Sequence, residues 1–234
     1  IDPLEIIDTY GADALRFTLA TGNSPGNDMR FYMERVEASR NFANKIWNAS
    51  RFIFMNLENS QKKEFKREDV NEALELSDKW IISRVNSLSK EMTENMDKFE
   101  LGIAVSKVYD FAWSEFCDWY IELVKQRLYS EDSISKDAAL YTLTYVLEKI
   151  LKLLHPFMPF ITEEIWSYME KEEKIIVSSW PVYQEADEFK SEEEKMDIII
   201  NAIRNLRNLR AEMNVPPSRK AKLLVVSNSA IKAV

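Results

Sequence analysis

The chain has 234 residues, of which 46% are hydrophobic and 30% are charged, a composition typical of a soluble globular protein with one large domain or one domain and an appendage. Four glycines and seven prolines are too few for the many tight turns of a β-sandwich or β-barrel, so we expect a mainly helical fold. The net charge of −8 argues against indiscriminate nucleic-acid binding, although residues 30–56 and 198–222 are locally basic.

The cysteine content and the hydropathy pattern limit where the protein can work. Cys117 is the only cysteine, which excludes an internal disulfide framework and fits a reducing compartment. No run reaches the roughly 18 apolar residues of a membrane span, and the start shows no signal-peptide pattern. We therefore expect a cytoplasmic protein without membrane contact. The sequence starts without Met, partway into an amphipathic pattern, which suggests a piece of a longer protein.

Apolar residues at helical spacing predict most of the secondary structure. The predicted helices cover, in chain order, residues 3–20, 32–57, 77–96, 103–128, 136–154, 159–166 and 192–213. A turn-rich stretch, 21–28, separates the first two helices, and a charged stretch, 58–71, predicts a surface connection. Residues 174–181 and 222–227 have the pattern of strands. The expected fold is a mainly α helical bundle with a small C-terminal α/β appendage.

The helix predicted over 32–57 carries two lines of side chains. Its apolar stripe consists of Phe42, Ile46, Ala49 and Ile53. At about 100° per residue, Phe52 lies roughly a quarter turn away from that stripe. It falls in line with the polar residues Asn41, Lys45 and Asn48, with Arg51 beside them. Amides, cations and a ring along one helix edge suit unstacked nucleotides; alternatively, Phe52 is the shoulder of a wide core face.

No catalytic constellation emerges from the sequence. His155 is the only histidine, so a multi-histidine metal site is impossible, and its place at a predicted helix end favours packing or capping. Cys117 lies among aromatic residues and is expected to be a small buried side chain. Glu163 and Glu164 point about 100° apart on a helix and cannot converge as a paired acid and base. We therefore expect the chain alone to catalyse nothing.

The basic stretch near the C-terminus allows two interpretations. Arg204, Arg207 and Arg210 recur at every third residue and form a slowly drifting ridge on the last predicted helix. The ridge is either a solvated helix face or a surface that contacts phosphate, because arginine forks match phosphate oxygens.

Eight segments, spread over nearly the whole chain, match one known family. They are Ile-Asp-Pro-Leu-Glu at 1–5, Tyr-Gly-Ala-Asp-Ala-Leu-Arg-Phe at 10–17, Gly-Asn-Ser-Pro-Gly-Asn-Asp-Met-Arg-Phe at 22–31, Ala-Ser-Arg-Asn-Phe-Ala-Asn-Lys-Ile-Trp-Asn at 38–48, Cys-Asp-Trp-Tyr-Ile-Glu at 117–122, His-Pro-Phe-Met-Pro-Phe-Ile-Thr-Glu-Glu-Ile-Trp at 155–166, and the pair 203–207 and 211–217. The chain resembles the class I valyl-tRNA synthetases. The segments at 22–31, 40–45 and 117–122 distinguish the valine enzymes from their class relatives.

The resemblance implies the role of each part of the chain. That family uses ATP to activate valine and transfers it to tRNA, but its catalytic motifs are absent from this sequence. The implied division is a junction after the catalytic domain at 1–33, an anticodon-binding bundle at 34–170 and a truncated C-terminal region at 171–234. We expect no cofactor in this chain, with ATP and Mg²⁺ bound by the full-length enzyme. The expected partners are valine-specific tRNA and the catalytic domain of the same polypeptide, in a monomer.

The resemblance also implies which residues contact tRNA. The implied anticodon contacts are Lys45, Asn48, Arg51 and Phe52, with Arg40 on the same helix. Lys125 and Arg127 are further candidates, although Gln126 stands where the family pattern has proline. Arg30, together with Asp28 and Met29, is implied to contact the inner corner of the tRNA near the junction.

Two alternatives remain open from the sequence. The equivalent domain of the isoleucine enzyme shares the bundle but lacks the patterns seen here at 27–31 and 41–45. A helical protein-interaction scaffold without an RNA role is the alternative from another functional class.

Overall fold

The structure is a computed structural model that describes residues 2–21, 30–60, 62, 65–216 and 218–224. Its α-helices are α1 (Pro3–Tyr10), α2 (Ala12–Ala20), α3 (Met33–Glu58), α4 (Arg67–Val70), α5 (Leu76–Asp97), α6 (Leu101–Asp110), α7 (Ile121–Leu128), α8 (Ser133–Leu154), α9 (Pro159–Ser167) and α10 (Lys190–Glu212). The other helical elements are the π-helix η2 (Phe111–Tyr120) and the 3-10 helices η1 (Asn71–Ala73), η3 (Ile175–Val177) and η4 (Glu185–Asp187).

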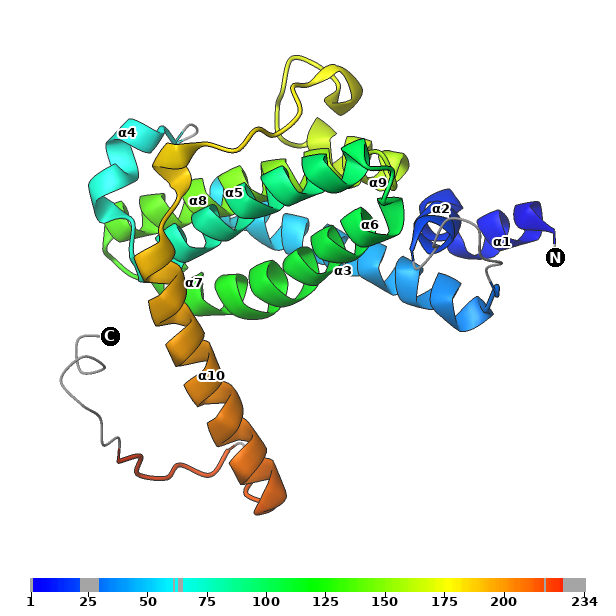
Figure 1. Ribbon diagram of the computed structural model, residues 1–234. Coiled ribbons are helices and arrows are strands. Elements are labelled where there is room, and N and C mark those ends of the chain that lie inside the picture. The colour runs from blue at the N-terminus through cyan, green and yellow to red at the C-terminus, as the bar shows by residue number, and fades with distance from the viewer. Residues whose placement is uncertain (1, 22–29, 61, 63–64, 217, 225–234) are drawn as a thin grey trace.

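Long helices packed side by side form a bundle around one main core. Helices α3, α5 and α8 and the continuous run from α6 through η2 to α7 enclose this core, and α2 and α9 close one end (Figure 1). Side chains from each wall are fully buried, including Phe42 of α3, Ile81 of α5, Tyr120 of η2 and Leu143 of α8. The prediction of a mainly α helical bundle is confirmed.

Helix α3 follows the predicted apolar stripe closely. It begins one residue after the predicted start and ends one residue after the predicted end. Phe42, Ile46, Ala49 and Ile53 all face the core, and none exposes more than 9% of its surface. The apolar period therefore fixed both the helix and the side of it that packs.

The first predicted helix is in fact two. Gly11 adopts φ of +91°, a conformation that side-chain-bearing residues rarely take, and it separates α1 from α2. Contacts from the first residues of α9 fix α2: the Asp13 carboxylate accepts backbone N–H groups of Phe160 and Ile161 at 3.2 and 2.7 Å. Arg16 donates to the Pro156 carbonyl at 3.0 Å. The start of α9 is thereby tied to α2. The predicted turn at 21–28 lies, apart from Thr21, outside the described residues.

The predicted helix over 103–128 contains an unexpected π-helix. Residues 111–120 adopt the wider i→i+5 hydrogen-bonding pattern, and it ends with the Ile121 N–H bonded to the Phe116 carbonyl. π-Helical segments are rare, occur mostly as single turns within α-helices and frequently lie at functional sites. The segment places Asp118 on the surface while the next residue, Trp119, is 9% exposed.

Several boundaries predicted from local pattern are wrong. The charged stretch 58–71 is not only a connection, because α4 forms within it and buries Val70 to 1% exposure. Helix α5 begins at Leu76, before the predicted capping pair, and the Asp78 carboxylate accepts the Glu75 N–H at 2.9 Å. Helix α8 begins at Ser133, capped by the Asp132 side chain.

The predicted strands are also corrected by the structure. Residues 174–181 contain η3 and irregular backbone: Ile175 is 3% exposed, whereas Ile176 and Val177 are 72% and 68% exposed. Residues 222–224 are irregular, and 225–227 lie outside the described residues. The described part of the C-terminal region is therefore helical and irregular rather than α/β. The division at residues 33 and 170 stays a prediction.

Helix α10 leaves the bundle at an angle and projects from it at its C-terminal end (Figure 1). Its first half packs against α5 and buries Met196 and Ile200. None of the described helices is long and apolar enough to cross a membrane.

Candidate nucleic-acid interface

Helix α3 presents a mainly polar edge that flanks its buried stripe and extends onto its exposed side. We define the α3 edge as Asn41, Asn44, Lys45, Asn48, Arg51, Phe52 and Met55, which recur at intervals of one, three or four residues. All are exposed except Lys45 and Phe52, which are half-buried. Neither Asn44 nor Met55 was singled out from the sequence, although the same helical spacing includes them. The edge offers three amides, two cations and two apolar groups along one line.

Phe52 takes an intermediate position that combines both interpretations of its sequence pattern. The ring packs against the margin of the core but remains partly exposed. The Lys125 Nζ atom of α7 lies 5.9 Å from the ring centroid. A ring that packs on the core and stays partly exposed can accept a stacked base on its exposed part.

The Lys45 side chain of α3 reaches across to the π-helix η2. Its Nζ atom is 2.5 Å from the Asp118 carboxylate and 3.9 Å from the centroid of the Trp113 ring. Asp118 exposes 52% of its side chain, so this ion pair is open to water and contributes little to stability. A phosphate or a base edge could therefore exchange with Asp118 at low cost.

Asn48 and Arg51 complete the central part of the edge. Both are exposed, and neither side chain has a hydrogen-bond or ion-pair partner among the residues that the structure describes. Their donors and acceptors are free to meet a ligand. The structure brings Lys45, Asn48, Arg51 and Phe52 together on one surface, as predicted.

Arg40 and Arg30 lie toward the other end of α3. The Arg40 guanidinium stacks 5.4 Å from the Tyr10 ring of α1 and pairs with Glu37 at 3.2 Å. Its Nε is the one buried side-chain nitrogen or oxygen in the described chain without a hydrogen-bond partner. Arg30 is exposed just before the helix, and Asp28 and Met29 lie outside the described residues.

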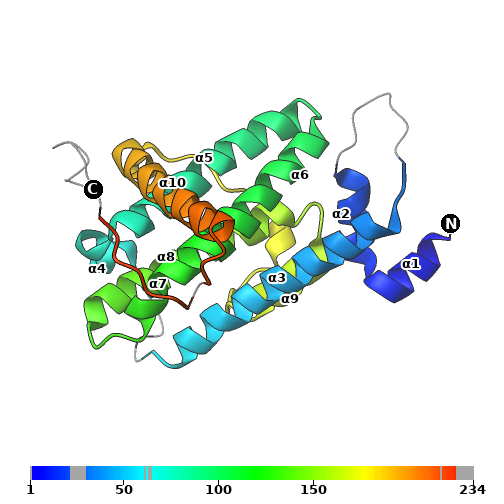
Figure 2. The same ribbon diagram turned by 90° about the horizontal axis from the view of Figure 1, so that it is seen from below.

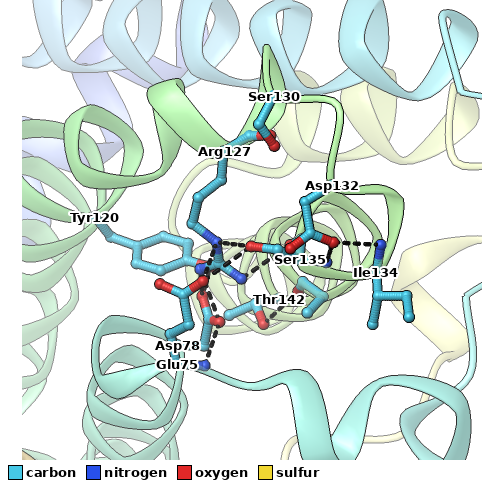
Figure 3. Close-up of polar contacts among 10 residues, drawn as sticks. Glu75, Asp78, Tyr120, Arg127, Ser130, Asp132, Ile134, Ser135 and Thr142 are labelled. Atoms are coloured by element: carbon cyan, nitrogen blue, oxygen red, sulfur yellow. Dashed lines mark hydrogen bonds and ion pairs between the residues drawn. The ribbon is translucent and has the colours of Figure 1, made fainter.

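Arg127 is held inside the bundle, as Figure 3 shows. One of its nitrogens contacts both oxygens of the Asp78 carboxylate at 2.8 Å, and Asp78 is completely buried. The Tyr120 hydroxyl donates to the same carboxylate at 2.7 Å, and the Arg127 guanidinium also donates to the side chain and carbonyl of Ser135. These bonds join α5, η2, α7 and α8. The Arg127 guanidinium therefore stabilises the fold and does not belong to the candidate interface.

Lys125 differs from Arg127 although both lie on α7. Its ammonium pairs with the exposed Glu122 carboxylate and faces Phe52. It therefore borders the α3 edge, and its predicted contact with tRNA stays a prediction.

The arginine ridge of α10 meets the π-helix. The guanidinium carbons of Arg204 and Arg207 lie 5.7 and 5.3 Å from the centroid of the Trp119 ring. Arg210 instead turns toward the C-terminal segment and donates to the carbonyls of Pro216 and Arg219 at 2.9 and 2.7 Å.

The surroundings of Cys117 and His155 give neither side chain a catalytic arrangement. Burial raises the pKa of the Cys117 thiol to about 12, so the thiolate is not available near neutral pH. The His155 Nδ1 lies 2.7 Å from the Thr162 hydroxyl at the end of α8. Among the described residues, no group of three His, Cys, Asp or Glu side chains is placed to hold a metal ion.

Comparison with known proteins identifies the family of the chain. The family model described as the anticodon-binding domain of tRNA ligase matches residues 78–225. Similar proteins include valine–tRNA ligases of Clostridium perfringens, Clostridium acetobutylicum and Bacillus anthracis, which are 58%, 56% and 46% identical over 99%, 100% and 96% of this chain. The chain spans only about a quarter of the length of these relatives, and α3 lies within the aligned part but before the family-model match.

A solved structure gives independent support for the fold. The LeuRS chain of a LeuRS–tRNA–LeuAMS ternary complex from Agrobacterium radiobacter K84 superposes with a TM-score of 0.62, covering 81% of this chain and 22% of that one. At 18% identity, this likeness concerns the fold alone. Because the family model matches most of its length, the chain belongs to the family of anticodon-binding domains of tRNA ligases.

Proposed function

We propose that this chain is the anticodon-binding part of a valine–tRNA ligase. The valine–tRNA ligases that are 46–58% identical along almost all of the chain support the valine assignment. The comparisons do not favour the isoleucine enzyme's equivalent domain or a helical scaffold without RNA binding.

The single observation that carries the mechanism is the composition of the α3 edge. Unpaired RNA bases are recognised by stacking on aromatic rings and by hydrogen bonds to their edges. Phe52 offers a supported, partly open ring, and Asn48 offers a free amide one helical turn away. Lys45 and Arg51 place positive charge on either side, where phosphates flank the bases. We infer that Phe52 stacks on one anticodon base while Lys45 and Asn48 contact base edges or adjacent phosphate.

In this proposal the chain recognises tRNA and the remainder of the enzyme performs the reaction. ATP and Mg²⁺ would bind the catalytic domain, which lies outside this chain, and the enzyme would act as a monomer. Helices α1 and α2 are then the connection to the catalytic domain, and the Asp13 contacts to α9 hold α2 against the bundle.

A binding titration tests the proposal. The chain is titrated with valine tRNA and with the same tRNA carrying an altered anticodon, each at two salt concentrations. We expect tighter binding to the natural anticodon and weaker binding at higher salt. Equal affinity for both tRNAs, or no binding, would refute an anticodon-recognition role.

A further inference from the structure

The stacked arginines of α10 form a surface feature separate from the α3 edge. Arg204 and Arg207 lie one helical turn apart, and both guanidinium groups lie over the same Trp119 ring, at 5.7 and 5.3 Å. Both arginines are exposed, whereas the ring beneath them is 9% exposed. The indole therefore restricts the conformations of the two arginine side chains. This reduces the conformational entropy that these side chains lose when a ligand binds.

The stacking leaves the hydrogen-bonding capacity of both arginines unused. A guanidinium that covers an aromatic face directs its N–H donors sideways, in the plane of the group. Neither arginine has a hydrogen-bond or ion-pair partner in the described part of the chain. Two arginines of the bundle do have partners: Arg84 pairs with Glu115, and Arg127 pairs with Asp78. Two oriented cations with free donors match the oxygens of phosphate groups.

The position of the pair relates it to the α3 edge. Two consecutive residues of the π-helix contact the two features: Asp118 pairs with Lys45 of α3, and Trp119 lies under the α10 arginines. Consecutive Cα atoms are about 3.8 Å apart, so the two features flank one turn of η2. Figure 2 shows α3 and α10 on either side of the run from α6 to α7.

We propose that Arg204 and Arg207 are a second RNA-contact site, which binds backbone phosphates of the same tRNA whose anticodon lies on the α3 edge. This inference rests on the proposed function and extends it to a second element. Contacts to phosphate supply affinity and position the RNA, but they do not read its sequence. The α3 edge thus distinguishes anticodons, and the α10 pair strengthens binding of all tRNAs equally.

A purely structural role is the competing explanation. Stacking on Trp119 could serve only to hold α10 against the bundle, in which case the two cations would affect stability and not RNA binding. The two roles differ in the salt dependence of binding, because each phosphate contact adds about 0.7–0.9 to the slope of log affinity against log salt.

The test compares three double variants with the parent chain in titrations with valine tRNA over a salt series. Arg204→Gln with Arg207→Gln is expected to lower the salt slope by about 1.4–1.8 and to weaken binding roughly tenfold to thirtyfold near 0.15 M salt. The ratio of affinities for the natural and altered anticodons should not change. Arg204→Lys with Arg207→Lys keeps both charges and should retain most of the slope.

Lys98→Gln with Lys174→Gln is the matched control. These two lysines are exposed but belong neither to α3 nor to α10, so this variant should leave the salt slope unchanged. Thermal unfolding of each variant shows that binding is measured on folded protein. If the glutamine variant unfolds at a lower temperature but binds with the parent's slope and affinity, the arginines are structural and the inference is wrong. If the parent chain shows no preference for the natural anticodon, that result refutes the proposed function, and the inference that rests on it is refuted as well.

Discussion

Two ion pairs of this protein use the same chemistry in opposite surroundings. Arg127 and Asp78 lie inside the bundle, where the arginine side chain is 12% exposed and the carboxylate is fully buried. Lys45 and Asp118 lie on the surface, where the side chains are 23% and 52% exposed. The sequence predicts RNA contact for both cations, but Arg127 is enclosed by the bundle whereas Lys45 is partly open to solvent.

The difference shows that burial decides what a basic residue does. A buried charge that loses its partner costs several kcal/mol, so Arg127 must keep Asp78 for the fold to persist. An exposed pair contributes about 0–1 kcal/mol and can exchange its partner for a phosphate. The following predictions test this contrast, from the largest expected effect to the smallest.

Asp78→Asn should have the largest effect on stability. The substitution leaves the Arg127 guanidinium buried without its main counter-charge, so we expect the free energy of unfolding to fall by about 3–5 kcal/mol in urea denaturation. Asp118→Asn is the matched control and should change it by less than about 1 kcal/mol. Equal losses from the two variants would remove the contrast between the pairs.

Phe52→Ala should have the largest effect on RNA binding. Loss of one stacked base is expected to cost about 1–3 kcal/mol, which is about a 5- to 150-fold rise in Kd for valine tRNA. The variant also loses some packing, so its binding is measured well below its unfolding temperature. Phe160→Ala removes a phenylalanine that is 65% exposed on α9 and should leave Kd unchanged.

Lys45→Gln should separate binding from stability. We expect Kd for valine tRNA to rise about fourfold near 0.15 M salt and the salt slope to fall by about 0.7–0.9, because one phosphate contact is lost. Urea denaturation should show a change below about 1 kcal/mol. A stability loss near that of Asp78→Asn would show that the surface pair supports the fold.

The smallest effect concerns pH. Burial lowers the pKa of His155 below its usual value, so the folded state favours the neutral ring. This contribution is present above the pKa of the unfolded chain and is lost as pH falls through the folded pKa. Stability should therefore decrease slightly between about pH 7.5 and 5.5, above the range in which carboxyl groups titrate. His155→Gln should flatten that decrease, whereas an unchanged decrease would assign it to other groups.

Features set by local pattern were predictable from the sequence. The apolar stripe of α3 and its off-stripe line of polar residues follow from helical spacing alone, and α3 begins and ends within one residue of its predicted limits.

Features set by distant contacts were not predictable. Arg127 meets Asp78 across 49 positions of sequence, and no local signal marks it as buried. The residues at 174–181 have strand propensity, but a β-strand requires a partner strand. In the structure a distant side-chain contact holds this segment: the Trp180 indole donates to the Thr93 hydroxyl at 2.9 Å. The π-helix likewise has no known sequence signal in this aromatic-rich segment.

The most direct test of the α3 edge is the ratio of Kd values for anticodon-altered and natural valine tRNA, measured side by side for the parent chain and Phe52→Ala. The account predicts a ratio well above one for the parent and a smaller ratio for the variant, because a base that no longer stacks on Phe52 is held less firmly against the amide of Asn48. A ratio of one in the parent, or an undiminished ratio in Phe52→Ala, would show that this edge does not read the anticodon.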